Sequence, residues 1–370
     1  MLKTEGFALN NRISLRQMQA LLFLEIFGFG ITALPRRVAE AAAQDGWIGV
    51  LLAVGVTLGL VWIIVHVGKK YTDSTFYDFV CKLLTKPVGI LVCLFLCLRL
   101  LLLASFNLRI FAEITQTMLL PTTPPLIIFA AMLALAAYGA SKGIEARGRM
   151  AEILIIIVLL PLILVFGLSA REIEFANLLP IFAANPAQLG SAGFSALFAF
   201  NGLDMLLLIM PFLARPKNAA KSAFGVVATM GGLMVVITAA TIARFGPENI
   251  VHHIWPVLKM MDTAAISGGI IDRQGALMMT FWIISAYAII NASLFFSSLL
   301  LKDVLRRGKH IHYILACVPI IAILANLPEN LAEVYNYFEV YNRTIALAAM
   351  VFLPLLLLVF SKIRGFKNAQ

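Results

Sequence analysis

The residues with the most informative chemistry lie in the stretch Leu21–Trp47, LLFLEIFGFGITALPRRVAEAAAQDGW. It is hydrophobic enough to begin a membrane span, yet Gly28 and Gly30 lie in its middle and Pro35 follows. Lipid cannot satisfy freed backbone amides, so such a break is tolerated only where it lines a protein cavity. The free N–H groups and positive dipole end of a half-helix can hold a carboxylate. The stretch therefore predicts a ligand site, with close helix packing at the two glycines as the alternative.

Composition assigns the chain to the helical membrane proteins. Hydrophobic residues make up 61% of its 370 residues and charged residues only 13%. Long apolar runs recur, each about the twenty residues that a helix needs to cross a bilayer, and the short alternating segments of a membrane β-barrel are absent. We predict an all-α polytopic membrane protein with ten transmembrane helices, near residues 16–36, 46–67, 88–112, 124–141, 150–168, 190–212, 222–243, 275–300, 311–327 and 343–361.

The distribution of Lys and Arg predicts the orientation, because cytoplasmic loops carry an excess of them. Twenty of these residues fall in the loops on the side of both termini. The opposite side holds seven, which are Arg36, Arg37, Arg171, Arg244, Lys259, Arg273 and Arg343. Both termini are therefore predicted to be cytoplasmic. Basic residues beside anionic lipid also explain the net charge of +10, so no nucleic-acid partner is expected.

Ten spans with both ends on one side divide into two halves of five that face the membrane in opposite directions, as in an inverted repeat. The expected repeats are about residues 13–168 and 189–361 of one transmembrane domain that covers residues 1–370. The break in span 1 then needs a partner in span 6, where Asn201 and Gly202 lie at the centre and Asp204 follows. Asp204 is costly at this depth without a cavity or a partner. It is either a proton-responsive group or a cap for the freed amides.

Several motifs resemble those of a known family. The break GFGITALP (Gly28–Pro35) resembles the Gly-x-Gly-Ile-x-x-x-Pro break of the amino acid/polyamine/organocation permeases, and FAFNGLD (Phe198–Asp204) resembles their span 6 break. The closer resemblance is to one branch, the permease-like B subunit of endospore germinant receptors, a group of spore germination proteins. The further marks of that branch, in an order that covers nearly the whole chain, are ISLRQMQALLF (Ile13–Phe23), AAAQDGWIGVLLA (Ala41–Ala53) and GIEARGRMAEIL (Gly143–Leu154).

The resemblance implies a LeuT-like 5+5 inverted repeat with broken helices 1 and 6, in the spore inner membrane or bacterial cell membrane. It also implies a sensor of a small-molecule germinant, most often an amino acid, that works beside the A and C subunits of a receptor complex. The alternative is a proton- or sodium-coupled amino acid transporter, since a fold alone does not separate a sensor from a pump. A scaffold that binds no small molecule is the third interpretation.

The resemblance also assigns ligand-binding roles to the two breaks. Span 1 would offer backbone amides to a ligand carboxylate, from Gly28, Phe29, Gly30, Ile31 and Thr32. Span 6 would offer carbonyl groups to an ammonium group and an aromatic wall, from Phe198, Ala199, Phe200, Asn201 and Gly202. Spans 3 and 8 complete such a site, and the candidates are Ser105, Phe106 and Asn107 on span 3 and Trp282, Ser285, Tyr287 and Asn291 on span 8. Packing is the alternative role for the aromatic residues.

Three further charged residues within the predicted spans bear on the site. Glu25 is about one turn before Gly28, Arg99 is deep in span 3, and Glu152 is near the start of span 5. A lone Arg at that depth costs at least ~2.5 kcal/mol. We therefore expect Arg99 to pair with Glu25 or Glu152.

The remaining motifs predict no catalytic chemistry. We find no Ser/His/Asp set in usable order, no nucleotide-binding loop and no carboxylate cluster, so we predict neither an enzyme nor a metal or other cofactor. His252 and His253 are neighbours that point in different directions, which argues against a shared metal ion. Their loop, Gly246–Asp272, is expected to form a short lid helix over the outer entrance. The loop Leu327–Asn342 is expected to be an irregular, acidic and aromatic surface.

Overall fold

The structure, a computed structural model, describes residues 12–28, 30–71, 74–169, 172–262 and 274–364. Within these ranges, only the backbone is described for residues 161, 162, 164, 165, 168, 169, 261, 262 and 274–281. The described part of the chain is helical, and its β-type pairing is limited to an isolated bridge between Ile13 and Leu213. The predicted all-α class is therefore confirmed.

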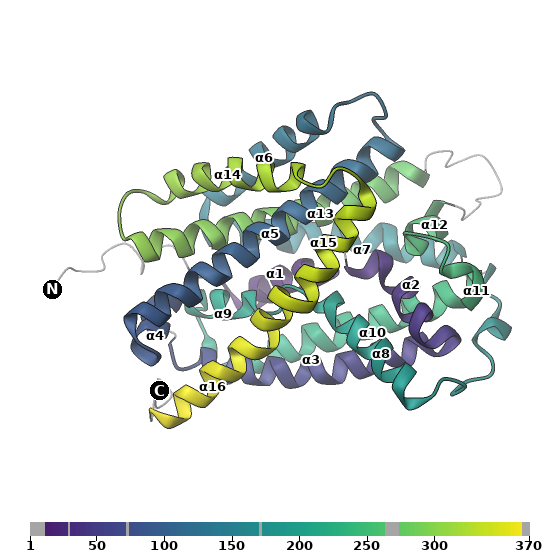
Figure 1. Ribbon diagram of the computed structural model, residues 1–370, viewed down its shortest axis with the longest axis horizontal. Coiled ribbons are helices and arrows are strands. Elements are labelled where there is room, and N and C mark those ends of the chain that lie inside the picture. Colours follow the sequence, from purple (N-terminus) through teal and green to yellow (C-terminus); the bar gives the residue numbers. More distant parts are fainter. Residues whose placement is uncertain (1–11, 29, 72–73, 170–171, 263–273, 365–370) are drawn as a thin grey trace.

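The helices coincide closely with the predicted spans (Figure 1). The first predicted span corresponds to α1 (Leu15–Phe27) and α2 (Gly30–Ala42), and the sixth to α8 (Pro186–Leu197) and α9 (Met205–Ile209). The others correspond to α3 (Gly46–Gly68), α5 (Lys86–Met118), α6 (Pro125–Ser141), α7 (Gly143–Ser169), α10 (Ala219–Phe245), α13 (Gln274–Leu305) and α14 (His310–Asn326). The last span corresponds to two π-helical segments, Asn342–Ala346 and Ala348–Phe352, followed by α16 (Leu353–Ile363), and α15 (Leu331–Tyr341) precedes it. Three short helices lie in connections: α4 (Phe76–Leu83), α11 (Pro247–Ile250) and α12 (Pro256–Asp262).

Six helical stretches of the described chain are long and apolar enough to cross a membrane, or up to seven if a bent pair of helices counts as one span. The six stretches are Gly30–Gly68, Lys86–Met118, Pro186–Phe212, Pro216–Phe245, Trp282–Leu305 and Leu331–Ile363, and the bent pair is Pro125–Ser141 with Gly143–Leu160. Because α1 and α2 have 13 residues each, about 20 Å of helix, neither crosses a bilayer alone. The chain is a multi-pass helical membrane protein, and the count of ten spans stays a prediction.

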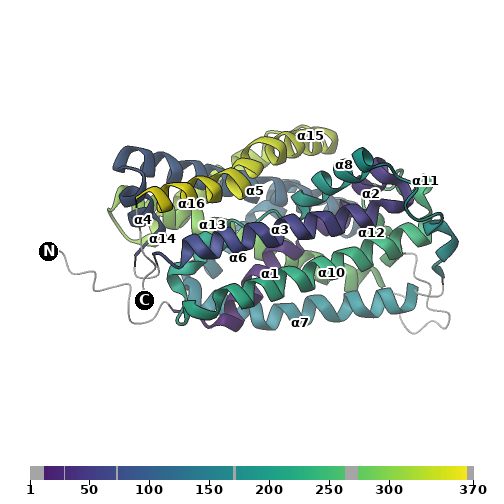
Figure 2. The same ribbon diagram turned by 90° about the horizontal axis from the view of Figure 1, so that it is seen from below.

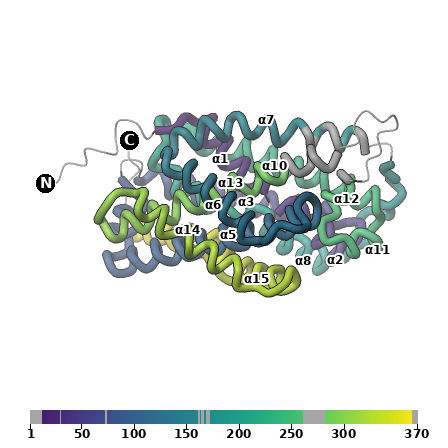
Figure 3. Tube along the Cα trace, turned by 90° about the horizontal axis from the view of Figure 1, so that it is seen from above, coloured from purple at the N-terminus to yellow at the C-terminus, as the bar shows by residue number. Residues whose placement is uncertain are grey.

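The helices pack through small residues, as is usual where lipid supplies no hydrophobic driving force between them. α3 lies between α8 and α10 (Figure 2). A Cβ on Gly49 of α3 would lie 2.5 Å from the Cβ of Ala192 in α8, and one on Gly231 of α10 would lie 2.4 Å from a methyl group of Val54 in α3. α5 and α13 pack along each other, and α6 and α14 cover one side of this pair (Figure 3). These contacts set the relative positions of the helices that surround the two breaks.

The beginning of α1 and the end of α16 lie at the same end of the bundle (Figures 1 and 2). Basic side chains make several contacts at this end. Lys70 donates to the hydroxyl of Ser361 at 3.1 Å, and Arg364 donates to the carbonyl oxygens of Lys82 and Leu84, each at 3.1 Å. This end is the one that the Lys and Arg distribution predicts to be cytoplasmic.

The segment Leu327–Asn342 is not irregular, so that expectation was wrong. Residues 331–341 form α15, and the side chain of Asn330 caps it by accepting from the backbone N–H of Glu333. Val334 and Phe338 are buried on one face of α15, while Glu333 and other acidic residues interrupt the apolar run along the sequence. The helical spacing of the apolar residues, rather than their continuity, was the informative signal.

Asp45 connects the start of α3 to the segment before α8. Its buried carboxylate accepts the backbone N–H of Phe182 at 2.9 Å and that of Ala184 at 2.8 Å. These charge-assisted bonds hold the entry into α8 against the α2–α3 connection. The Asp-Gly-Trp motif therefore helps to set the position of the second broken helix relative to the first.

Candidate functional site

The predicted break in the first span is present. α2 begins at Gly30, and the preceding Phe29 lies outside the described residues. Pro35 lies inside α2 and does not end it, so the glycines rather than the proline mark the break. Ile31 and Thr32 are buried in the first turn of α2, where backbone N–H groups have no partner within the helix.

Both glycines of the break also allow close packing. A Cβ on Gly28 would lie 1.9 Å from Cδ1 of Ile289 in α13, and one on Gly30 would lie 2.8 Å from the Cα of Ala199. Close packing, the alternative interpretation of these glycines, is therefore confirmed at both positions. It also brings the backbone at Gly30 directly against the broken segment after α8.

The predicted break in the sixth span is present and lies beside the first. α8 ends at Leu197, a 3₁₀ turn covers Phe198–Phe200, and α9 begins at Met205. Gly202 in this break has φ of +116°, a conformation that favours glycine. A Cβ on Gly202 would lie 3.4 Å from the carbonyl oxygen of Glu25, so the second break contacts the last turn of α1.

Arg99 is paired with Asp204, and not with either glutamate as expected. Arg99 Nη2 lies 2.6 Å from Asp204 Oδ1, and the two side chains are 0% and 1% exposed. The Asp204 carboxylate makes no capping hydrogen bond to α9, so its expected capping role is also wrong. Glu25 is buried near the pair, and Glu152 lines a separate open groove between α1, α7 and α10.

Asn201 joins this ion pair to the last helical segment. Arg99 Nη2 donates to Asn201 Oδ1 at 2.5 Å, and Asn201 Nδ2 donates to Asn342 Oδ1 at 3.0 Å. The hydroxyl of Tyr341 donates to the carbonyl oxygen of Arg99 at 3.2 Å. Sequence reasoning missed Tyr341 and Asn342. The available signal was a buried amide at the start of a long apolar run, since such polar groups need partners within the bundle.

Two neighbouring cavities lie at the breaks. The smaller, of about 30 Å³, is lined by Glu25, Gly30, Ala199, Asn201 and Ile289 together with Ile26, Ala33, Leu34, Arg37, Leu103, Asn107, Ser195, Phe198 and Phe338. The larger, of about 300 Å³, shares Ala33, Arg37, Ser195 and Phe198 with it. A volume of about 30 Å³ holds roughly one water molecule, so a ligand would have to widen the smaller cavity.

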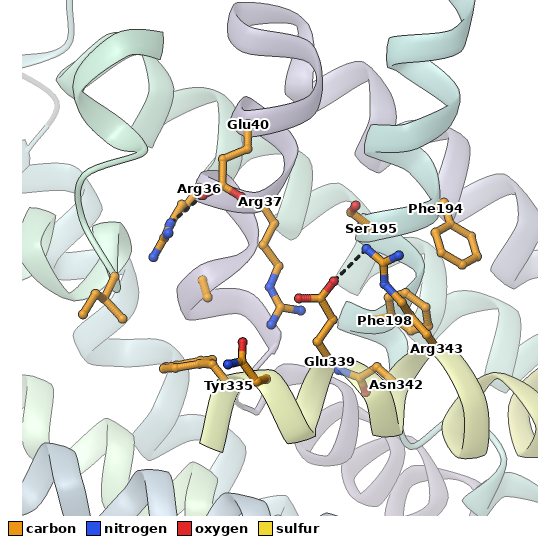
Figure 4. A pocket seen from close by; sticks show the side chains of 13 residues that line it. Arg36, Arg37, Glu40, Phe194, Ser195, Phe198, Tyr335, Glu339, Asn342 and Arg343 are labelled. Atoms are coloured by element: carbon orange, nitrogen blue, oxygen red, sulfur yellow. Dashed lines mark hydrogen bonds and ion pairs between the residues drawn. The ribbon is translucent and has the colours of Figure 1, made fainter. Parts of the chain in front are cut away.

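The larger cavity is strongly charged (Figure 4). Arg36 pairs with Glu40 at 2.7 Å, and Arg343 pairs with Glu339 at 2.7 Å. Arg37 points from α2 toward Glu339 in Figure 4, and no ion pair or hydrogen bond of its side chain is recorded within the described residues. With three arginines and two glutamates, this cavity has an excess of positive charge, which favours anionic groups.

Most candidates on the third and eighth spans lie beside the smaller cavity rather than in its wall. Ser105 bonds within its own helix at 2.7 Å to the carbonyl oxygen of Leu101, and the ring of Phe106 packs against Phe338 at 5.4 Å between centroids. Trp282 and Ser285 are buried in α13. Asn107, the third candidate on span 3, does line the cavity, together with Leu103 on α5 and Ile289 on α13, which sequence reasoning missed.

The loop after α10 contains short helices, α11 and α12, as predicted for its described part, and residues 263–272 lie outside it. Ile254 from this loop lines the larger cavity. The indole N–H of Trp255 donates to the hydroxyl of Tyr335 on α15 at 2.6 Å. This bond joins the loop to the helix that forms the opposite wall of the cavity.

Replacing Tyr335 by Phe is expected to loosen this connection. The change removes the acceptor of the Trp255 N–H and lowers the free energy of unfolding by about 1 kcal/mol. The midpoint of thermal unfolding of the purified protein measures this loss. Tyr337→Phe is the matched control, because Tyr337 lies on the same helix and is 52% exposed. Equal midpoints for the two variants would show that the Trp255–Tyr335 bond contributes nothing.

Arg147 is one of the twenty basic residues that the sequence places in the loops on the side of both termini, and this assignment was wrong. It lies in the first part of α7, is 2% exposed, and donates from Nε to Asn291 Oδ1 on α13 at 2.6 Å. Its guanidinium also lies 4.7 Å from the centroid of the Phe295 ring, a cation–π contact. A third, very small cavity of about 10 Å³ lies between Arg147, Asn291 and Glu25.

The family comparison agrees with these features. The family of the spore germination protein matches residues 12–334. Spore germination protein YndE of Bacillus subtilis (strain 168) is 25% identical over 97% of this chain and 98% of its own length. Spore germination protein GerLB of Bacillus cereus is 26% identical over 92% of this chain and 91% of its own, and spore germination protein B2 of Bacillus subtilis (strain 168) is 22% identical over 86% and 88%. A match that spans both broken helices and most of the chain shows that this protein belongs to the spore germination protein family.

Proposed function

We propose that this protein is the nutrient-sensing B subunit of a spore germinant receptor and binds a small molecule, an amino acid by preference, where its two helix breaks meet. Membership of the spore germination protein family supports the germination role. The single observation that carries the location of the site is the contact between the breaks, where Gly30, Ala199 and Asn201 line one cavity.

At this site the ligand carboxylate is held by backbone amides at the start of α2, beginning at Gly30. The positive dipole end of α2 favours an anionic group there. Carbonyl groups of Phe198–Gly202 accept from the ligand ammonium. Phe198 lines both the smaller and the larger cavity, so a displacement of its ring joins them into one space of sufficient size.

The same proposal includes the architecture and the setting. Ten spans form a LeuT-like inverted repeat, because α1 with α2 and α8 with α9 occupy corresponding places in the two halves. Both termini face the cytoplasm from the spore inner membrane, which agrees with basic residues at the end where α1 begins and α16 ends. The A and C subunits of the receptor are the proposed partners, and relatives that are spore germination proteins support this assignment.

A coupled amino acid transporter is the second candidate. Small cavities lie on two sides of Glu25, one toward Asn201 and one toward Arg147 and Asn291, which is the arrangement that a coupled ion or proton would use. Uptake of labelled ligand into proteoliposomes under an imposed gradient separates the two functions. A sensor binds without accumulation, whereas a transporter accumulates ligand.

Binding of one amino acid is expected to raise the unfolding midpoint of the purified protein, because a ligand that binds only the folded state stabilises it. The twenty amino acids, nucleosides and simple sugars are tested one at a time by thermal shift. A concentration-dependent rise with one amino acid supports the proposed site. No rise with any compound would contradict ligand sensing by this subunit alone and favour a scaffold within the receptor complex.

A further inference from the structure

Glu25 is a charged side chain of the site whose carboxylate takes no part in the contacts described above. It lies in the last turn of α1, is 4% exposed, and its Oε2 has no hydrogen-bond partner. No ion pair of Glu25 is recorded within the part of the chain that the structure describes. The residue lines the 30 Å³ cavity at the breaks and also the 10 Å³ cavity beside Arg147.

A buried carboxylate without hydrogen bonds is unfavourable unless a cation compensates it. Two buried arginines lie nearby, and each has one side of its guanidinium bonded and a buried nitrogen, Nη1, without a hydrogen-bond partner. Arg99 lies 2.6 Å from Asp204, and Arg147 donates to Asn291 at 2.6 Å and packs over Phe295. Arg147 interacts electrostatically with Glu25 and lines the 10 Å³ cavity with it, so it compensates part of the buried charge. Glu25 also lines the cavity at the breaks, where the ammonium group of a ligand can supply a second cation.

The dipoles of the two helix ends favour one orientation of the ligand in the break. The C-terminal end of α1 carries the negative end of its dipole, and the N-terminal end of α2 carries the positive end of its own. A cation is stabilised on the α1 side of the break, where Glu25 lies, and an anion on the α2 side, where Gly30 begins the helix. The break as a whole matches a molecule that carries both charges.

The balance of buried charge selects the same class of ligand. Arg99 and Arg147 carry two positive charges, Glu25 and Asp204 carry two negative charges, and Arg37, which lines the same cavity as Glu25, adds one positive charge. A zwitterion brings no net charge into this region of low dielectric and presents an ammonium to Glu25 and a carboxylate to the positive side, whereas a simple amine adds a further positive charge.

We propose that Glu25 is the counter-ion for the ammonium group of a zwitterionic ligand at the α1–α2 break. The inference rests on the proposed function and names a side chain, in addition to backbone carbonyl groups, that recognises the ammonium. It also identifies the ligand class as compounds that carry an ammonium and a carboxylate together.

The test compares the binding of two probes to three proteins: the wild type, Glu25→Gln and the control Glu152→Gln. The probes are the amino acid that gives the largest thermal shift with the wild type and its des-amino analogue, in which hydrogen replaces the ammonium group. Affinities are measured by titration of the purified full chain. Glu25→Gln is expected to weaken binding of the amino acid at least tenfold and not to weaken binding of the des-amino analogue, because the change removes a negative charge from the site. Glu152→Gln is the matched control, because Glu152 lines a different groove, and both affinities should stay unchanged.

The inference would be overturned, while the proposed function stands, if Glu25→Gln bound the amino acid with unchanged affinity. Equal losses of affinity for both probes would also overturn it, because they would indicate a structural role for Glu25. A wild type that binds both probes equally would also overturn it, and this comparison does not depend on the folding of any variant. If no amino acid binds the wild type, the proposed function fails, and the inference fails with it.

Discussion

Arg99→Met is expected to destabilise the protein more than any other change considered for this molecule. It leaves the Asp204 carboxylate buried without its partner at 2.6 Å, and breaking a buried ion pair from one side costs about 3–5 kcal/mol. Asn201 also loses the donor to its Oδ1. The expected result is a large fall in the amount of folded protein in the membrane and in the unfolding midpoint of the protein that remains.

The double variant Arg99→Met/Asp204→Leu distinguishes the cost of an unpaired buried charge from the cost of altered packing. Replacing both partners of a buried pair by apolar residues is often neutral or stabilising, so the double variant should recover much of the lost stability. Arg306→Met serves as the surface control. Arg306 pairs with Asp78 at 2.5 Å, but their side chains are 64% and 37% exposed, and such pairs contribute about 0–1 kcal/mol. Similar losses for Arg99→Met and Arg306→Met would contradict the importance of the buried pair.

The two helix breaks could be predicted from the sequence because they depend on local chemistry. Glycine, proline and asparagine within an apolar run disfavour a continuous helix wherever the chain folds. The capping box at the start of α1, with Ser14 and Gln17 bonded to each other's backbone N–H groups, is equally local. Once one break was identified, the span count located the second, and the structure brings both together at Gly202 and Glu25.

The partners of the buried charges could not be predicted in the same way. Glu25 is nearer to Arg99 along the chain, yet Arg99 is paired with Asp204, more than a hundred residues away in the sequence. The choice between two carboxylates at similar depth depends on which faces of α1, α5 and the broken segment after α8 point inward. One sequence does not determine that rotation, because an apolar helix in a bundle shows little amphipathic pattern.

The burial of Arg147 could not be predicted from the sequence for a related reason. Its neighbours include Arg149 and Lys142, and a cluster of basic residues at a span boundary normally indicates a solvated cytoplasmic loop. The bond to Asn291 and the contacts with two phenylalanine rings bury it instead. These partners come from α13, so only the tertiary arrangement distinguishes Arg147 from Arg149, which is exposed.

Gly30→Ala is expected to be the second most disruptive of the proposed changes. The added Cβ would lie 2.8 Å from the Cα of Ala199 and 3.0 Å from its carbonyl oxygen. Both atoms belong to the backbone, so no side-chain rotation relieves the overlap, and the two broken segments must move apart. Overpacking of this kind costs about 1–3 kcal/mol. Because the two breaks form the proposed site, ligand binding should be lost together with stability.

Gly55→Ala is the control for this change, and its expected effect has the opposite sign. Gly55 lies inside α3 with no atom within 4 Å of an added Cβ, and alanine is favoured over glycine in a helix by about 1 kcal/mol. The unfolding midpoint should therefore fall for Gly30→Ala and rise or stay constant for Gly55→Ala. A Gly30→Ala protein as stable as the wild type that has lost ligand binding would assign Gly30 to ligand contact alone. A protein that keeps both properties would show that the breaks do not touch as described, and the proposed site would have to lie elsewhere in the bundle.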